Sequence, residues 1–171
     1  MVGVDMKYFG HTDLVVNSMR NVLPERTGIL PAQAAISQYE RSDEANAEQV
    51  KAKTVTTFHG IFDTGASCSV ISERVAEQLA LRKTNTVTVH TAAGTVQQNC
   101  YVINLVLPNG IVLPARQAIA AKLHGFDLLI GMDVIRLGDF YISHRHDFLV
   151  VEFTLYTPIV CIDSSQIQTS Q

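Results

Sequence analysis

The sequence predicts an all-β fold that contains one or two short helices. Three observations support this prediction. Apolar, β-branched and aromatic residues gather in runs of strand length, turn-forming Gly, Pro and Asn separate several of these runs, and only short segments have helical spacing. With 171 residues, of which 47% are hydrophobic, the chain is long enough for one compact domain with a substantial core.

The expected strands follow one another along most of the chain. Residues 84–107 alternate Thr with Val, break at the small residues 92–94 and resume, which is the pattern of a hairpin. Residues 108–110 (Pro-Asn-Gly) predict a second turn, and the polar residues 144–147 separate the last two strands. Besides the hairpin, the expected strands are 32–40, 54–62, 111–121, 126–130, 139–143 and 148–153.

Two short helices are expected. Val75 and Leu79 have helical spacing within residues 72–81. Residues 132–137 predict a second helix that Gly138 closes. Asp133 stands at its start, where a carboxylate that accepts backbone N–H groups would cap it.

Charge and hydropathy argue against two classes of partner. The net charge is −3, the pI is near 6.0, and the 13 Lys and Arg are scattered, so neither nucleic acid nor a membrane surface is expected as a partner. No apolar run approaches the roughly 18 to 20 residues of a membrane span. Charged residues interrupt the first 14 positions, so a signal peptide is not expected either.

The cysteines and histidines predict neither a disulfide framework nor a metal site. Cys68, Cys100 and Cys161 are odd in number and widely separated, which favours a reducing, cytoplasmic location. His144 and His146 are one residue apart, but no third ligand is suggested, so a polar turn is preferred.

The motif Asp63-Thr64-Gly65 stands between two apolar runs, Ile61–Phe62 and Val70–Ile71. A carboxylate in such surroundings is costly to bury unless other groups hold it. On a tight turn, the Thr hydroxyl can brace the loop and the Gly permits close approach of backbone and neighbouring groups. We therefore expect a turn that presents a hydrogen-bonded carboxylate.

Such a carboxylate becomes an effective catalyst when a second one lies within a few ångströms. The two cannot both ionise comfortably, so they share a proton, and one acts as base while the other acts as acid. The pair can take a proton from water and protonate the oxygen of a carbonyl under attack. This chemistry hydrolyses a peptide bond without a metal or a covalent intermediate.

The chain resembles the retropepsin-type aspartic proteases, the single-domain, retroviral-like proteases. The resemblance rests on "FDTGASCSVIS" (62–72) and "FDLLIGMDVI" (126–135), the family's apolar-apolar-Gly motif, which follow in the family's order, with the hairpin around "TAAG" between them. It covers roughly residues 52–155. It implies a closed β-barrel or sandwich with a flap hairpin, assembled as a homodimer, that hydrolyses peptide bonds in peptides or proteins without a cofactor.

The resemblance also implies a role for each matching position. Asp63 would be catalytic, Thr64 would interlock two active-site loops, and Gly65 would form part of the floor beneath the substrate, in a loop supported by Ala66 and Ser67. Because the sequence has one D-T-G, each chain supplies half of the dyad, and a symmetric dimer is required. The remaining positions are the flap or substrate-binding residues Thr91, Ala92, Ala93 and Gly94, and the structural second motif, Ile130, Gly131 and Asp133.

The chain ends depart from the simplest pattern of the family, because 62 residues precede Asp63. We expect an extension at 1–28, the retropepsin-like domain at 29–156 with a polar insertion at about 40–51, and a C-terminal tail at 157–171. The extension is interpreted as an arm, a propeptide or an extra strand, and residues 16–31, with two prolines and a glycine, predict an irregular lead-in. "ILPAQAAIS" and "KTVTTFHGIF" are one candidate for a first hairpin.

Several alternatives stay open at this point. A dimeric peptide-binding or scaffold domain of the same fold, without turnover, is the principal rival, and a protease that processes its own precursor is a weaker one. Asp133 is a less favoured candidate for a second carboxylate within one chain. Ser67 and Ser69 lack a G-x-S-x-G setting and are expected to form hydrogen bonds rather than to act as nucleophiles. Cys68 is interpreted as a small buried hydrophobe beside the loop.

Overall fold

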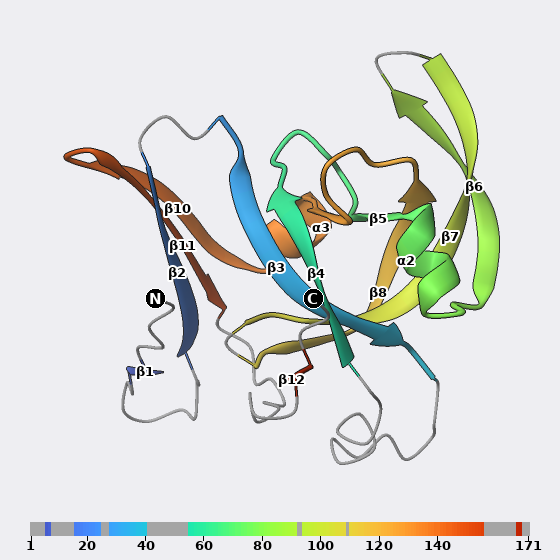
Figure 1. The fold of residues 1–171 in the computed structure, drawn as a ribbon, viewed down its shortest axis with the longest axis horizontal. Coiled ribbons are helices and arrows are strands. Elements are labelled where there is room, and N and C mark those ends of the chain that lie inside the picture. The colour runs from blue at the N-terminus through green and yellow to red at the C-terminus, as the bar shows by residue number, and fades with distance from the viewer. Residues whose placement is uncertain are drawn as a thin grey trace.

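The computed structural model describes residues 6–7, 16–24, 28–40, 55–91, 94–108, 110–155 and 167–168. Within these ranges the chain is mostly strand, with two short helices, and it forms two sheets (Figure 1). The predicted all-β class is therefore confirmed. No helix in these ranges is long and apolar enough to cross a membrane.

The larger sheet closes on itself. Its strand order is β12-β4-β3-β7-β8-β5-β9, and β4 also pairs with β9, so that six strands form a barrel (Figure 1). Because the β4–β9 pairing completes the ring, the row of six strands does not end in an unpaired strand edge. The strands of this sheet are β3 (Leu30–Gln38), β4 (Val55–Phe62), β5 (Val70–Ser72), β6 (Lys83–Thr91), β7 (Gly94–Val106), β8 (Val112–Ala121), β9 (Leu128–Ile130) and β12 (Ile167–Gln168).

Hairpins supply most of this sheet. β3 and β4 pair antiparallel, which confirms the first hairpin suggested by the sequence; the polar insertion between them lies outside the described residues. β6 and β7 form the expected second hairpin, with Thr91 opposite Gly94. The expected turn before β8 is present, and the N–H of Gly110 donates to the carbonyl of Leu107 at 2.9 Å.

The smaller sheet contains a strand at residues where the sequence predicted an irregular lead-in. Its order is β1-β2-β11-β10, with all pairs antiparallel. β2 occupies Val16–Pro24, so the prediction of an irregular lead-in is wrong for these residues. The strand pairs with β11 from Asn17 to Pro24, and the proline is its last residue. The other strands are β1 (Met6–Lys7), β10 (Gly138–Arg145) and β11 (Phe148–Leu155).

Aromatic contacts join the two sheets. Phe62 ends β4, and its ring centroid lies 5.1 Å from that of Phe140 on β10 and 6.2 Å from that of Phe153 on β11. Phe62 and Phe153 are buried in the main core. The residue before Asp63 is therefore anchored in the centre of the molecule.

The two helices flank the predicted motifs. α2 spans Glu73–Gln78 and begins after Ser72, whose hydroxyl accepts a hydrogen bond from the N–H of Val75. α3 spans Met132–Ile135 and ends at Arg136. Gly138 therefore does not close α3 as predicted. It begins β10, where a Cβ atom would overlap the carbonyl of Thr154.

The predicted domain boundaries remain predictions. Pairing of β2 with β11 agrees with the extra strand among the three interpretations of the N-terminal extension. In the C-terminal tail, β12 pairs in parallel with the first two residues of β4. The rest of that tail lies outside the described residues.

Candidate active site

Asp63 lies in a tight turn directly after β4. Its N–H donates to the carbonyl of Ile130 at 3.0 Å, and its Oδ1 accepts from the N–H of Gly65 at 2.8 Å. The carbonyl of Asp63 accepts from the N–H of Ala66 at 3.3 Å. These bonds hold a half-buried carboxylate in a fixed direction, while Thr64 beside it is exposed.

The second motif packs directly beneath this turn. β9 runs parallel to β4 with Ile130 opposite Phe62, and the N–H of Met132 donates to the carbonyl of Ala66 at 2.8 Å. A Cβ atom at Gly131 would lie 2.6 Å from both the carbonyl carbon and oxygen of Cys68. The two motifs, which are far apart in the sequence, therefore form one closely packed unit that requires glycine at position 131.

Ser69 ties this unit together. Its side chain is buried, its hydroxyl donates to Oδ1 of Asp133 at 2.9 Å, and it accepts from the N–H of Gly131 at 3.1 Å. This bears out the expectation of a hydrogen-bonding serine. The cap predicted for Asp133 is wrong: the N-cap of α3 is Gly131, which has no side chain, and the Asp133 carboxylate accepts from Ser69 instead.

Cys68 belongs to the first motif, where its backbone packs against Gly131, and it is half-buried with a free thiol. Burial raises the pKa of this thiol, and the Asp133 carboxylate raises it further, while a hydrogen bond with Ser67 lowers it. A raised pKa keeps the sulfur protonated near neutral pH. The cysteine therefore has the character of a packing residue rather than of a nucleophile.

A second polar cluster, around Asp127, was missed in the sequence. The Asp127 carboxylate accepts from the hydroxyl of Ser72 at 3.0 Å and from Nε of Arg74 at 3.2 Å, with Nη2 of Arg74 on its other oxygen. Its carbonyl accepts from the N–H of Ser72, and its N–H donates to the carbonyl of His59. One signal in the sequence could have indicated this cluster, the acidic Asp127 beside the apolar run of β9. Residues 126–127 were instead predicted to belong to that strand.

Two of the four predicted flap residues are in strands: Thr91 ends β6 and Gly94 begins β7. Ala92 and Ala93 lie outside the described residues, and only the backbone pairing of Thr91 with Gly94 is described. Behind the tip, Val96 is exposed. The expected hairpin is therefore present at this place.

The predicted polar turn near the C-terminus is present. His144 lies on β10, and His146 lies in the turn to β11 with a left-handed φ of 54°. Among the residues that the structure describes, no three His, Cys, Asp or Glu side chains are grouped so as to hold a metal ion. Cys161, like the tail around it, is not among them.

Comparison with known proteins agrees with this geometry. The sequence profile of gag-polyprotein putative aspartyl proteases matches residues 43–137, which is more than half of the chain. The chain belongs to this family. The matched stretch contains Asp63, the β6–β7 hairpin and the second motif. No curated protein sequence matches the chain significantly.

The chain is similar to solved structures at low sequence identity. A retropepsin-like aspartic protease from Rickettsia conorii is 14% identical, with a TM-score of 0.50, and the match covers 86% of this chain and all of that one. The retroviral protease-like domain of Ddi1 from Leishmania major is 17% identical, with a TM-score of 0.43, over 78% of this chain and 97% of that one. The family match and the likeness to the Rickettsia structure confirm the retropepsin-like fold that the two motifs predicted.

Proposed function

We propose that this chain is an aspartic endopeptidase that acts as a homodimer, with one Asp63 from each chain in the active site. The observation that carries the proposal is a braced carboxylate: Asp63 lies in a turn fixed by Gly65 and Ile130, in a member of an aspartyl protease family. The sequence holds one D-T-G, so a symmetric pair supplies the second carboxylate.

In this proposal, the two carboxylates share one proton and divide the chemistry between them. The ionised one takes a proton from a water molecule, whose oxygen forms a bond to the peptide carbonyl carbon. The protonated one gives its proton to the carbonyl oxygen, which forms a tetrahedral intermediate. The C–N bond of this intermediate then breaks, and the carboxyl group that took the proton from water gives it to the leaving amine. Neither metal nor cofactor is needed.

The surrounding elements suit an extended peptide substrate. The peptide would lie as a strand between the β6–β7 hairpin, acting as a flap, and the floor at Gly65. Thr64 is exposed in the single chain, as expected of a residue that interlocks with the other loop at a two-fold axis. Apolar side chains near the cut are expected to be preferred. The cytoplasmic location remains a sequence-based prediction.

The test is the substitution Asp63→Asn, assayed on peptides between about pH 4 and 7. Cleavage should fall by roughly 10²-fold to 10⁴-fold or more, because general acid–base chemistry is lost. Asp147→Asn, which changes an exposed carboxylate in the β10–β11 turn, is the matched control. Sedimentation or light scattering should show a dimer for all three proteins, and undiminished cleavage by Asp63→Asn would eliminate the proposal.

A second measurement separates an enzyme from a silent scaffold of the same fold. A peptide that carries a hydroxyl group in place of the scissile carbonyl mimics the tetrahedral intermediate, so a catalytic dyad should bind it far more tightly than the plain peptide. Equal affinities for the two peptides would favour the peptide-binding scaffold.

A further inference from the structure

A row of residues crosses four neighbouring strands of the barrel. The register places Thr57 of β4 opposite Ala35 of β3, and Ala35 opposite Val106 of β7. Val106 in turn lies opposite Val112 of β8. Because residues that are directly opposite one another point to the same face of a sheet, these four side chains share one face. We call them the outer row.

The outer row faces away from the main core. Side chains alternate between the two faces along a strand. The neighbours of the row in the chain, among them Ile36, Leu105 and Leu113, belong to the main core, whereas no member of the row does. The row therefore lies on the outside of the barrel.

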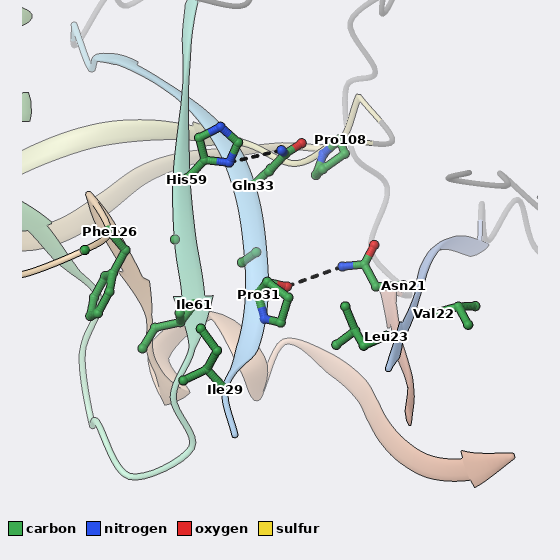
Figure 2. A pocket seen from close by; sticks show the side chains of 13 residues that line it. Asn21, Val22, Leu23, Ile29, Pro31, Gln33, His59, Ile61, Pro108 and Phe126 are labelled. Carbon is green, nitrogen blue, oxygen red and sulfur yellow. Dashed lines mark hydrogen bonds between the residues drawn. The ribbon is translucent and has the colours of Figure 1, made fainter. Parts of the chain in front are cut away.

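Three members of the outer row are nonetheless buried: the exposed fractions are 2% for Ala35, 1% for Val106 and 5% for Val112. The next pair along the same face, Gln33 of β3 and His59 of β4, is exposed and lines a cavity (Figure 2). Burial therefore changes within two residues along the strand. Because this burial exists within a single chain, a further segment of the chain covers the outer row and ends before Gln33 and His59.

Two polar atoms at this place point to the same conclusion. Asn104 precedes Val106 by two residues on β7 and is 5% exposed. Its Nδ2 donates to the hydroxyl of Ser37 at 3.3 Å, but its Oδ1 is buried without a hydrogen-bond partner among the described residues, as is Oγ1 of Thr57. A buried polar atom without a partner costs free energy. We therefore expect the covering segment to supply hydrogen-bond donors as well as apolar side chains.

The C-terminal strand brings the end of the chain to this place. On the side of β4 that faces away from β3, β9 pairs with Gly60–Phe62, and β12 pairs in parallel with Val55–Thr56. β12 therefore lies directly beside Thr57, at one end of the outer row. Whatever leads into β12 approaches the barrel at that end.

The chain that leads into β12 is long enough to cross the outer row. Eleven residues, 156–166, separate Leu155 at the end of β11 from Ile167 at the start of β12. Fully extended, a segment of this length reaches about 36 Å. The row spans three strand spacings, which is about 14 Å.

The composition of the C-terminal tail fits the outer row. Residues 159–162 (Ile-Val-Cys-Ile) are apolar, residues 164–166 (Ser-Ser-Gln) carry donors, and Asp163 is the one charged residue of 157–171. The polar insertion fits less well, because residues 41–53 hold six charged side chains, which are costly to bury without partners. Residues 8–15 connect β1 with β2, which pair at Lys7 and Val16, so this segment begins and ends at the smaller sheet.

We propose that the C-terminal tail docks on the outer row of its own chain. Its apolar residues 159–162 pack on Ala35, Val106 and Val112, and its polar residues supply donors to Thr57 and Asn104 before β12 pairs with β4. The tail thereby holds the first half of the strand that leads to Asp63. The inference does not depend on the proposed function, since it uses no residue of the catalytic turn, and the tail lies beyond the family match at 43–137.

Amide hydrogen exchange read by mass spectrometry tests the docking in the unmodified protein. Residues 159–168 should exchange at least roughly tenfold more slowly than the same residues in a synthetic peptide of residues 157–171, because packing and strand pairing protect amides. Exchange as fast as in the free peptide would overturn the proposal. Protection that is lost on dilution would place the tail on a second copy and would also overturn it.

Substitutions on the outer row test the place of docking. Val106→Thr combined with Val112→Thr puts hydroxyl groups in place of methyl groups beneath the tail, so exchange of residues 159–168 should rise at least roughly tenfold while that of β10 and β11 stays unchanged. Val102→Thr is the control, because Val102 lies on the same strand and face but outside the row. Equal effects of the double variant and the control would contradict the proposal. Faster exchange only at residues 8–15 or 41–54 would assign the cover to that segment and refute docking of the tail.

A proline in β12 tests its pairing with β4. Ile167→Pro removes an N–H group from the paired residues, so exchange of residues 55–57 should rise at least roughly tenfold. Ser170→Pro makes the same change beyond the pairing, which ends at Gln168, and should leave residues 55–57 unchanged. The same exchange at residues 55–57 in both variants would show that the tail does not hold β4.

Discussion

The hydroxyl of Ser69 lies 2.9 Å from Oδ1 of Asp133, although the two residues are 64 positions apart in the sequence. The same hydroxyl accepts from the N–H of Gly131 at 3.1 Å. One buried oxygen thus joins the loop that follows Asp63 to the start of α3. The orientation of the candidate catalytic turn depends on this junction, so its disruption should affect both stability and activity.

Ser69→Ala should destabilise the protein by about 1–3 kcal/mol, because it leaves the buried N–H of Gly131 without an acceptor and removes the donor to Asp133. The control is Ser67→Ala, which removes a hydroxyl from an exposed position of the same loop. Urea unfolding of both variants measures the difference. Equal stabilities would show that the junction contributes nothing.

Substitutions of Asp133 separate hydrogen bonding from charge. Asp133→Asn retains a side-chain oxygen that can accept from Ser69, so it should cost less than about 1 kcal/mol, whereas Asp133→Leu removes the acceptor and should cost about 1–3 kcal/mol. Peptide cleavage should survive the first change and weaken with the second. If both variants lost cleavage as completely as Asp63→Asn, Asp133 would have to be a catalytic carboxylate, contrary to the assignment made here.

Gly131→Ala should destabilise the protein by about 1–3 kcal/mol, because the new methyl group would lie 2.6 Å from the backbone of Cys68 and push the catalytic loop aside. Gly28→Ala is the control, since no heavy atom lies within 4 Å of a Cβ at that position. Thermal unfolding of the two variants gives the comparison. A Gly131→Ala protein as stable as the control would contradict the close packing of the two motifs.

The barrel was predictable because its strands have local signals. Alternation of Thr with Val, followed by small residues at 92–94, identifies the β6–β7 hairpin within a short stretch of sequence. The D-T-G turn and the later apolar-apolar-Gly motif likewise have short, specific patterns. These features depend on neighbours in the chain, which a sequence displays directly.

The features that were missed depend on distant partners. β2 is a strand because it pairs with β11, more than 120 residues later, whereas its own proline and polar residues suggested an irregular segment. Asp133 resembled a helix cap because its true partner, Ser69, is remote in sequence. The Asp127 cluster is formed by contacts that span 53 and 55 positions. Local propensity is a weak guide where tertiary contacts select the conformation.

The Asp127 cluster predicts unequal effects for its two charged members. Asp127→Ala should cost about 1–3 kcal/mol, because it removes the acceptor for the Ser72 hydroxyl as well as for Arg74. Arg74→Ala should cost less than about 1 kcal/mol, since its side chain is 65% exposed and water replaces the lost contact. Urea unfolding at low and at 1 M salt would check this, and an Arg74 effect as large as that of Asp127 would refute the ranking.

Cys68 should react slowly with alkylating reagents near neutral pH. Burial raises the pKa of its thiol above the ordinary value of 9.0, so at pH 8 the reactive thiolate is scarcer in the folded protein than in the unfolded chain. Iodoacetamide labelling across a pH series, followed by mass spectrometry of the peptide that contains Cys68, measures this rate against the protein unfolded in urea. Labelling at equal rates in both states would contradict the raised pKa.

The same shift has a consequence for stability at alkaline pH. Well below pH 9 the Cys68 thiol is almost fully protonated in both the folded and the unfolded states and adds almost no pH dependence. As the pH rises past that value, the unfolded chain loses the proton first, so the free energy of unfolding falls until the folded thiol ionises too. Cys68→Ser, which has no such ionisation, should lose less stability than the unmodified protein between pH 8 and pH 10.5 when both are unfolded with urea. An equal loss would show that other groups cause the alkaline decline.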